Sequence, residues 1–310
     1  MNKKLNQATE NLIDSYFASE TYIQHLDRQP LPSTEKVIAI VKVLQELMFP
    51  GFFGRQEFSD EQLRLHVATQ MAWLYETLIE QIKRSFAHGD ALGAICAKTE
   101  RDAADVAAEF LIMVPRLREI LAADVDAAYD GDPIAACKDE VISSYPSVYA
   151  VMIYRLAHEL YKLDVPLIPR VMTEHAHHRT GIDIHPATQI GSGFFIDHGT
   201  GVVIGGTAII GNRVKIYQGV TLGAFSFPKD ASGNLIRDTK RHPTIEDDVV
   251  IYSGATILGG DTVIGRGSAI GGNVWLTKSV PPFTKVYQDT PRLRIITPED
   301  LSNQIWDYVI

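Results

Sequence analysis

The chain has 310 residues, which is long enough for two domains and a sizeable hydrophobic core. Its formal net charge of −9 argues against a nucleic-acid-binding surface, and an anionic substrate would need a local cluster of basic side chains. The N-terminus lacks the apolar stretch of a secretory signal, no run of 18 apolar residues predicts a membrane span, and neither Cys96 nor Cys137 belongs to a CxxC pair, so we expect a cytoplasmic protein.

Residues 1–180 have the spacing of amphipathic helices. The segment 59–86 begins with a capping box formed by Ser59 and Gln62, and apolar residues then recur on one helical face. Similar faces predict three more helices, over residues 37–48, 102–129 and 147–163. Pro115 predicts a kink or break in the second of these. We expect the apolar stripes to pack against one another, which makes this half an all-α domain.

From residue 181 the sequence follows a period of six. Two apolar columns run side by side, the first formed by Ile204, Ile210, Ile216 and Leu222 and the second by Val202, Ala208, Val214 and Val220. An α-helix would repeat at about 3.6 residues and a strand at about 2, so neither explains this pattern. It is typical of a coil of short parallel strands, in which each repeat forms one side of a prism. The ladder resumes at Ile245, slips by one residue at Gly259-Gly260 and is expected to end at Pro281-Pro282.

We therefore predict an α+β chain with a helical domain over residues 1–180, a parallel β-helix over 181–282 and a C-terminal tail over 283–310, with a helix over 299–308. The polar segment 224–243 has no period, and so long a loop inside a compact repeat is usually functional. Prisms of this kind commonly associate about a threefold axis. We expect a homotrimer or a dimer of trimers, with sites between neighbouring subunits.

The ladder is broken around His198, and this break is where we expect chemistry. Imidazole titrates near neutrality and suits a general base, which usually needs a carboxylate to orient it. Asp183 lies fifteen positions upstream, so successive turns of the coil could bring the pair together on the same or a neighbouring subunit. Asp197 is a second carboxylate within reach of a ligand. A histidine bonded only to backbone carbonyls on a solvated corner is the alternative.

Further polar residues have a functional and an ordinary explanation. Arg241, followed by His242, ends the polar loop, and a guanidinium can hold a carboxylate with two hydrogen bonds, although a solvated loop charge is equally compatible. Asp132 fits an ordinary turn. We interpret the histidine run 175–178 as a polar helix end and expect no metal, because Glu174 is the only acidic ligand near it in sequence.

Several short motifs resemble those of the bacterial serine O-acetyltransferase family. They are Asp183-Ile184-His185-Pro186, Ile196-Asp197-His198-Gly199-Thr200-Gly201, Val220-Thr221-Leu222-Gly223, Arg241-His242-Pro243 and, in the helical half, Gly131-Asp132-Pro133 and Tyr154-Arg155-Leu156-Ala157-His158. The six-residue repeat is shared by many acyltransferases, whereas this combination is specific. The resemblance implies a left-handed parallel β-helix. It also implies an enzyme of cysteine biosynthesis that transfers the acetyl group of acetyl-CoA to L-serine, giving O-acetyl-L-serine and CoA.

The resemblance also implies a role for each candidate residue. His198 would take the proton of the serine hydroxyl and Asp183 would orient it. Asp132 and Asp197 would hold the serine ammonium, and Arg241 with His242 the serine carboxylate. Acetyl-CoA would lie along the coil near four small residues, Gly223, Ala224, Ser253 and Gly272. Attack would be direct, within a ternary complex, without a covalent enzyme intermediate.

The chain departs from the family pattern at two places. Gly206 stands where the family usually has glutamate, and Ala224 stands where many members have glycine, before a longer loop. The resemblance further implies that the C-terminal Ile310 binds the next enzyme, O-acetylserine sulfhydrylase, and that cysteine inhibits at the serine site. An apolar end packed on its own domain is the alternative for Ile310.

Three other functions are compatible with a coil of this kind. A related acetyltransferase would act on another hydroxyl, such as that of a sugar, and would not need paired groups for a zwitterion. A zinc carbonic anhydrase would need three histidines around one metal, for which His185, His198 and His242 are the candidates. A trimeric scaffold without activity would not need His198 and Asp183.

Overall fold

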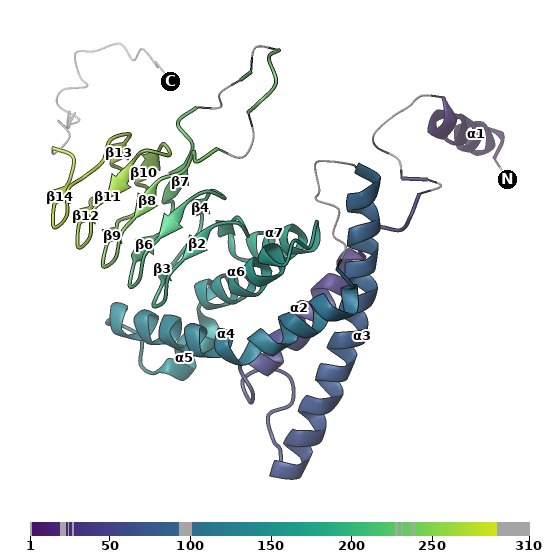
Figure 1. The fold of residues 1–310 in the computed structure, drawn as a ribbon, viewed down its shortest axis with the longest axis horizontal. Coiled ribbons are helices and arrows are strands. Elements are labelled where there is room, and N and C mark those ends of the chain that lie inside the picture. Colours follow the sequence, from purple (N-terminus) through teal and green to yellow (C-terminus); the bar gives the residue numbers. More distant parts are fainter. Residues whose placement is uncertain are drawn as a thin grey trace, which may run out of the picture.

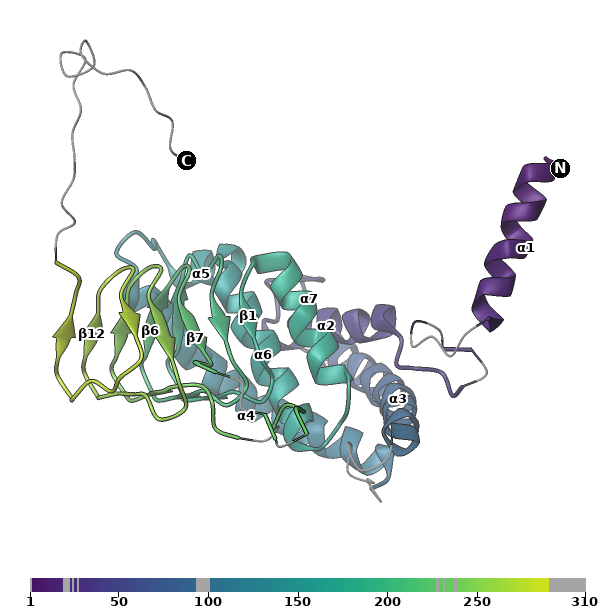
Figure 2. The same cartoon turned by 90° about the horizontal axis from the view of Figure 1, so that it is seen from above.

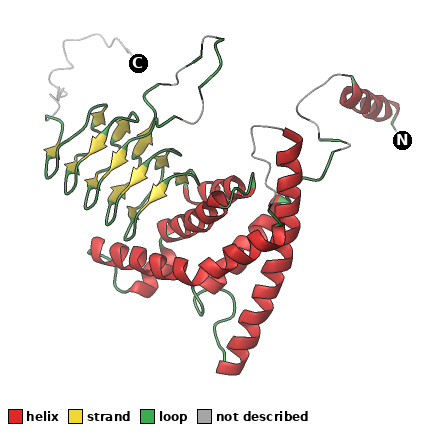
Figure 3. Cartoon of the chain, viewed as in Figure 1, coloured by secondary structure: helices red, strands yellow, loops and turns green. Residues whose placement is uncertain are grey.

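The computed structural model describes residues 2–18, 23, 25–26, 28–92, 101–226, 229–230, 232–236 and 239–289. Helices occupy the chain up to Thr180, and short strands follow from Asp183 onward (Figures 1 and 3). This arrangement confirms the predicted helical region followed by a parallel coil. None of the helices in the described part combines the length and apolarity that crossing a membrane requires. The predicted tail helix over 299–308 and Ile310 lie outside the described residues.

The described part of the helical half contains seven helices. They are α1 (Lys3–Phe17), α2 (Thr34–Met48), α3 (Asp60–Leu92), α4 (Ala103–Gly131), α5 (Lys138–Ser144), α6 (Pro146–Lys162) and α7 (Ile168–Thr180). The four predicted helices correspond to α2, α3, α4 and α6, whereas α1 and α5 have no predicted counterpart. Figure 2 shows α1 apart from the rest of the molecule, and none of its residues is buried.

Side-chain caps set the starts of two predicted helices. The Ser59 amide donates to Gln62 Oε1 at 3.1 Å and the Gln62 amide donates to Ser59 Oγ at 3.3 Å, which confirms the capping box of α3. Asp102 caps α4 by accepting from the Ala104 amide. Pro115 does not break α4, because Val114 and Leu117 on either side of it are buried in the helical core and offset the missing hydrogen bond.

The strands form a three-sided prism. They are β1 (Asp183–Ile184), β2 (Gln189–Ile190), β3 (Phe195–Asp197), β4 (Val203–Ile204), β5 (Ile209–Ile210), β6 (Lys215–Tyr217), β7 (Thr221–Gly223), β8 (Thr244–Ile245), β9 (Val250–Ile251), β10 (Thr256–Leu258), β11 (Val263–Ile264), β12 (Ala269–Ile270), β13 (Trp275–Leu276) and β14 (Lys285–Val286). All pairs are parallel, in the sheets β1-β4-β7-β10-β13, β2-β5-β8-β11 and β3-β6-β9-β12-β14. Each turn thus adds one strand to each face, as the period of six predicted.

The apolar ladder forms the inside of the prism. Four residues of the first column are almost completely buried and lie on the successive strands β4, β5, β6 and β7: Ile204, Ile210, Ile216 and Leu222. Their stacking in register is what a six-residue repeat requires, since the same inward position recurs on every side. The pairing continues beyond Pro281-Pro282, because β14 pairs with β12, so the ladder ends later than predicted.

Two corners of the prism carry most of the candidate site residues. The His198 corner consists of residues 198–202, 218–220, 252–255 and 271–274, between the β3 and β1 sheets. The His242 corner consists of residues 185–188, 205–208, 224–226, 239–243 and 259–262, between the β1 and β2 sheets. Ile196 and Ile204 are eight positions apart instead of six, so the His198 corner is enlarged where the sequence predicted a break.

Candidate functional site

One face of α6 fixes the first turn of the prism. The Tyr154 hydroxyl donates to the Thr188 carbonyl at 2.6 Å, and Arg155 Nη2 donates to the Gly191 carbonyl at 2.8 Å. His158 Nδ1 lies 2.7 Å from the Pro186 carbonyl oxygen. These contacts explain why the Tyr154–His158 motif accompanies the coil motifs, since it holds the turn from which the candidate residues project.

His198 lies in the enlarged corner with its side chain 74% exposed. Its backbone has a φ of 57°, a left-handed conformation that is uncommon for residues other than glycine and is often found at functional sites. Nε2 lies 3.9 Å from Asp197 Oδ1, too far for a hydrogen bond. The imidazole therefore projects from the prism beside one carboxylate and is open to a ligand.

Asp197 and Asp132 reach the same region from opposite halves of the chain. Asp197 ends β3 and is almost buried, and its Oδ2 lies 3.0 Å from Lys215 Nζ on β6. Asp132 directly follows α4, where its Oδ2 accepts from the Tyr145 hydroxyl at 2.5 Å and its Oδ1 from the Ile134 amide. The hydrogen bond from Tyr145 lowers the pKa of Asp132, and the same bond raises the pKa of Tyr145 to about 12.

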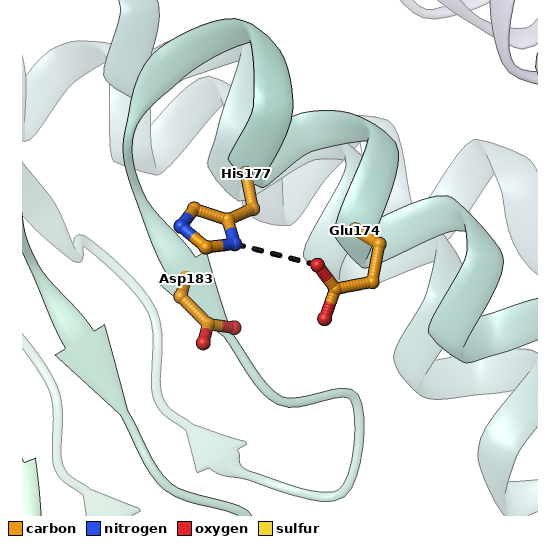
Figure 4. Close-up of side chains that lie close together, drawn as sticks. All are labelled: Glu174, His177 and Asp183. Carbon is orange, nitrogen blue, oxygen red and sulfur yellow. Dashed lines mark hydrogen bonds and ion pairs between the residues drawn. The ribbon is translucent and has the colours of Figure 1, made fainter.

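Asp183 does not contact His198 within the described part of one chain. It lies instead beside α7, where the side chains of Glu174 and His177 approach it (Figure 4). Arg170 Nη1 is 3.7 Å from Asp183 Oδ1, and the same guanidinium forms an ion pair with Glu174. The pairing of Asp183 with His198 therefore stays a prediction.

The same group is the one set of potential metal ligands among the described residues. Glu174, His177 and Asp183 each offer an atom within 4.8 Å of the others, a proximity that sequence spacing did not reveal. The Arg170 guanidinium pairs with Glu174 and lies 3.7 Å from Asp183, so a cation already occupies the place beside both carboxylates.

His242 is buried in the second corner, where Thr207 fixes its ring. Nδ1 accepts from the Thr207 amide at 3.1 Å, which in a neutral ring places the proton on Nε2. Burial lowers the pKa of His242 to about 4, with a smaller contribution from the positive charges of Arg241 and Lys240. His242 is thus a neutral hydrogen-bond donor at physiological pH, next to the half-buried guanidinium of Arg241.

His185 lies against Gly206, where the chain departs from the family pattern. A Cβ atom at Gly206 would lie 2.7 Å from His185 Nδ1 and 3.0 Å from Cγ, closer than such contacts allow. The ring is held there because His185 Nδ1 accepts from the Ala187 amide at 3.1 Å. The space in which a larger residue would begin is therefore filled by His185, which also lies in the His242 corner.

The predicted site residues consequently fall into two groups. His198, Asp197 and Asp132 gather at the His198 corner, whereas Arg241 and His242 gather at the other edge of the β1 sheet. The predicted acetyl-CoA residues divide in the same way. Gly223 ends β7 and Ala224 follows it at the His242 corner, whereas Ser253 and Gly272 lie in the His198 corner. The three histidines proposed as zinc ligands are likewise separated, with only His185 and His242 on one corner.

A cavity of about 340 Å³ lies beside the end of β7. Phe225, Lys240, Arg241, Leu258 and Thr277 are among its lining residues. It therefore adjoins both Gly223-Ala224 and the residues expected to hold a carboxylate. Lys215, Tyr145 and Thr207 were missed by the sequence argument, because each acts through a contact between segments far apart in the chain.

Known proteins settle the family. No family model matches the chain. The serine acetyltransferase of Synechococcus elongatus described as "plasmid" is 46% identical over 288 residues, which are 92% of this chain and 88% of that protein. The chain belongs to the serine acetyltransferase family. The resemblance inferred from the motifs is thereby confirmed, and the chain is an enzyme of this family, which implies use of acetyl-CoA.

Solved serine acetyltransferases have the same fold. Isoform 3 of Entamoeba histolytica, in complex with cysteine, is 35% identical, covers 97% of this chain and 98% of its own, and has a TM-score of 0.68. The enzyme of Neisseria gonorrhoeae, in complex with serine, is 25% identical, covers 82% and 97%, and has a TM-score of 0.53. The serine acetyltransferase fold therefore extends over the helical half as well as the coil.

Proposed function

We propose that the chain transfers the acetyl group of acetyl-CoA to the hydroxyl of L-serine, with His198 as general base. The observation that carries this proposal is the placement of two carboxylates, Asp132 and Asp197, beside an exposed imidazole. Serine is a weak nucleophile with a positive ammonium group, so it needs a base and a negative partner at short range. The cluster at the His198 corner supplies both.

In the proposed reaction His198 takes the proton of the serine hydroxyl as its oxygen attacks the thioester carbon. The C–S bond then breaks, and the imidazolium returns the proton to the CoA thiolate. No covalent enzyme intermediate is needed, and a base of this kind typically contributes about 10²–10⁴ in rate. Asp183 orients His198, from the neighbouring subunit or after a rearrangement of its Arg170 contact.

Serine is held by its two charged ends. Asp132 and Asp197 retain free lone pairs for the ammonium, since each oxygen in the structure uses only part of its acceptor capacity. Arg241 and the neutral Nε2–H of His242 are donors for the carboxylate. Because the two sets lie on different corners, one serine molecule is bound by two copies of the chain.

A homotrimer, alone or as one half of a dimer of trimers, brings these corners together. Threefold packing of three-sided prisms places the His198 corner of one copy beside the His242 corner of the next, and a closed ring generates three equal sites. The acetyl-CoA residues follow the same division, so CoA lies in the groove between neighbours, near Gly223 and Ala224 of one copy and Ser253 and Gly272 of the other.

Two further interactions, with cysteine and with a second enzyme, would regulate the activity. Cysteine differs from serine by one atom and is bound in the Entamoeba histolytica structure, so we expect it to compete at the serine site. The C-terminal Ile310 is proposed to bind O-acetylserine sulfhydrylase, and deletion of Ile310 should abolish co-elution of the two enzymes.

The first test is acetyl-CoA consumption, followed by thiol release, with L-serine as acceptor. We expect turnover by the wild-type enzyme and a loss of about 10²–10⁴ in kcat for His198→Ala with an unchanged fold. Full activity of His198→Ala would refute the base assignment. Turnover with a sugar hydroxyl and none with serine would show that serine is not the acceptor, while the assignment of His198 as the base would stand.

A further inference from the structure

Lys215 projects from β6 toward Asp197 and the end of α4, directly before Asp132. We propose that Lys215 is a positioning residue of the acceptor site, which fixes Asp197 and the end of α4 so that the site carries one net negative charge for one substrate ammonium. This inference rests on the proposed function, because it concerns how that site recognises the amine of its acceptor.

The Lys215 ammonium joins the two halves of the chain. Its Nζ lies 3.0 Å from Asp197 Oδ2 on the neighbouring strand and donates to the Gly131 carbonyl at 2.7 Å. Gly131 is the last residue of α4, where a positive charge also complements the helix dipole. Asp132 follows directly, so one ammonium group holds both carboxylates at their relative positions.

Gly131 packs closely against β3. A Cβ atom there would lie 2.9 Å from Phe195 Cδ1, so the end of α4 already rests against β3. The Lys215 Nζ in turn lies 4.9 Å from the centre of the Phe195 ring and 4.5 Å from that of Tyr217. Such cation–π contacts stabilise the ammonium away from bulk water.

Lys215 is too enclosed to serve as an ordinary surface charge. Its side chain is 17% exposed and that of Asp197 is 12% exposed. Burial by itself lowers the pKa of Lys215, but hydrogen bonds with Tyr217 and Asp197 more than offset that effect, so the pKa lies above its usual value. The lysine is therefore charged throughout the range in which the enzyme would work.

Lys215 sets the net charge of the acceptor site. Asp132 and Asp197 alone would place two negative charges in a half-buried site, which disfavours ionisation of one of them. With Lys215 the three groups sum to one negative charge, the complement of one ammonium. Because Lys215 binds Oδ2 of Asp197, the other oxygen is the one that faces His198, at 3.9 Å from Nε2.

The experiment compares Lys215→Met and Lys215→Gln with a matched control, Lys285→Met. Lys285 lies on β14 in the same column of the same sheet, through the register Lys215–Val250–Ala269–Lys285, but it is exposed. For each variant the KM for L-serine, the KM for acetyl-CoA, kcat and the thermal midpoint are measured. The Ki of 3-hydroxypropanoate, which has the hydroxyl and carboxylate of serine but no ammonium, is measured in parallel.

We expect both Lys215 variants to raise the KM for L-serine roughly tenfold, the size of one charge-assisted hydrogen bond, with the KM for acetyl-CoA and the Ki of 3-hydroxypropanoate within about twofold of wild type. The acidic limb of kcat/KM for serine should move to higher pH. Removing the lysine leaves Asp197 and Asp132 without their positive partner beside His198, because the neighbouring Tyr145 and Tyr217 hydroxyls carry no positive charge.

An unchanged KM for serine in the Gln variant, which keeps a donor for the Gly131 carbonyl, would overturn the inference. So would a parallel rise in the serine KM and the 3-hydroxypropanoate Ki, because a general distortion of the site affects both. If Lys215→Met does not fold, the Gln variant decides. Failure of the wild-type enzyme to use serine would contradict the proposed function itself. That result can be told apart from both outcomes for the Lys215 variants.

Discussion

Arg155 of α6 and Asp124 of α4 form a bidentate ion pair in the interior, with Nε and Nη2 at 2.5 and 2.7 Å from the two carboxylate oxygens. Both side chains are about 95% buried. Asp124 also accepts from the Phe194 amide, and Arg155 also donates to the Gly191 carbonyl. The pair therefore connects two helices to the first turn of the prism, which carries the candidate site.

We predict that Arg155→Ala lowers the free energy of unfolding by about 3–5 kcal/mol, because it leaves the Asp124 carboxylate buried without its cation. Chemical denaturation of the two proteins would measure the difference. The control is Arg213→Ala, which breaks a similar bidentate pair with Asp248 on the surface and should cost about 1 kcal/mol or less. Equal losses for the two variants would show that burial does not set the value of the Arg155 pair.

The division of the site between two corners predicts complementation between inactive variants. His198→Ala and Arg241→Ala should each be nearly inactive. When equal amounts are unfolded together and reassembled, mixed trimers contain one site with both residues intact, and random mixing should restore about a quarter of wild-type activity. The measurement is specific activity against mixing ratio. If all residues of a site came from one chain, no mixture would recover activity.

The buried state of His242 predicts a loss of stability in acid. Its pKa of about 4 lies below the ordinary value of 6.5, so between these pH values the unfolded chain takes up a proton that the folded chain does not. Stability should therefore fall as pH drops from about 6.5 to 4, by on the order of 2 kcal/mol from this residue.

The comparison of wild type with His242→Gln isolates this effect from the other buried histidines, whose pKa values are also lowered. We expect the thermal midpoint of the Gln variant to depend less on pH over this range. A variant as sensitive to pH as the wild type would contradict a lowered pKa of His242 in the folded chain.

Gly206→Glu should be unfavourable here although glutamate is the usual family residue. The new Cβ atom would collide with the His185 ring, which is held by the Ala187 amide, and overpacking of this kind typically costs about 1–3 kcal/mol. The double variant Gly206→Glu with His185→Ala should recover part of that loss. Additive losses in a double-mutant cycle would contradict the proposed contact.

The sequence by itself determined the elements whose signals are local. The capping box of Ser59 and Gln62 set the start of α3. The period of six predicted a coil of short strands, because each repeat adds one side and returns the same position to the interior. The enlarged corner at His198 was visible as two extra residues in that period. The motifs identified the family because they are short and contiguous.

The tertiary structure decided the contacts between distant segments. Lys215 meets the Gly131 carbonyl across 84 positions, and Asp183 lies against α7 instead of His198. Helix α1 had no predicted counterpart, and none of its residues is buried. A repeat fixes where each side chain points, but which ammonium reaches which carboxylate depends on how α4 rests on β3. That packing is set by the summed contacts of two domains and leaves no periodic trace in the sequence.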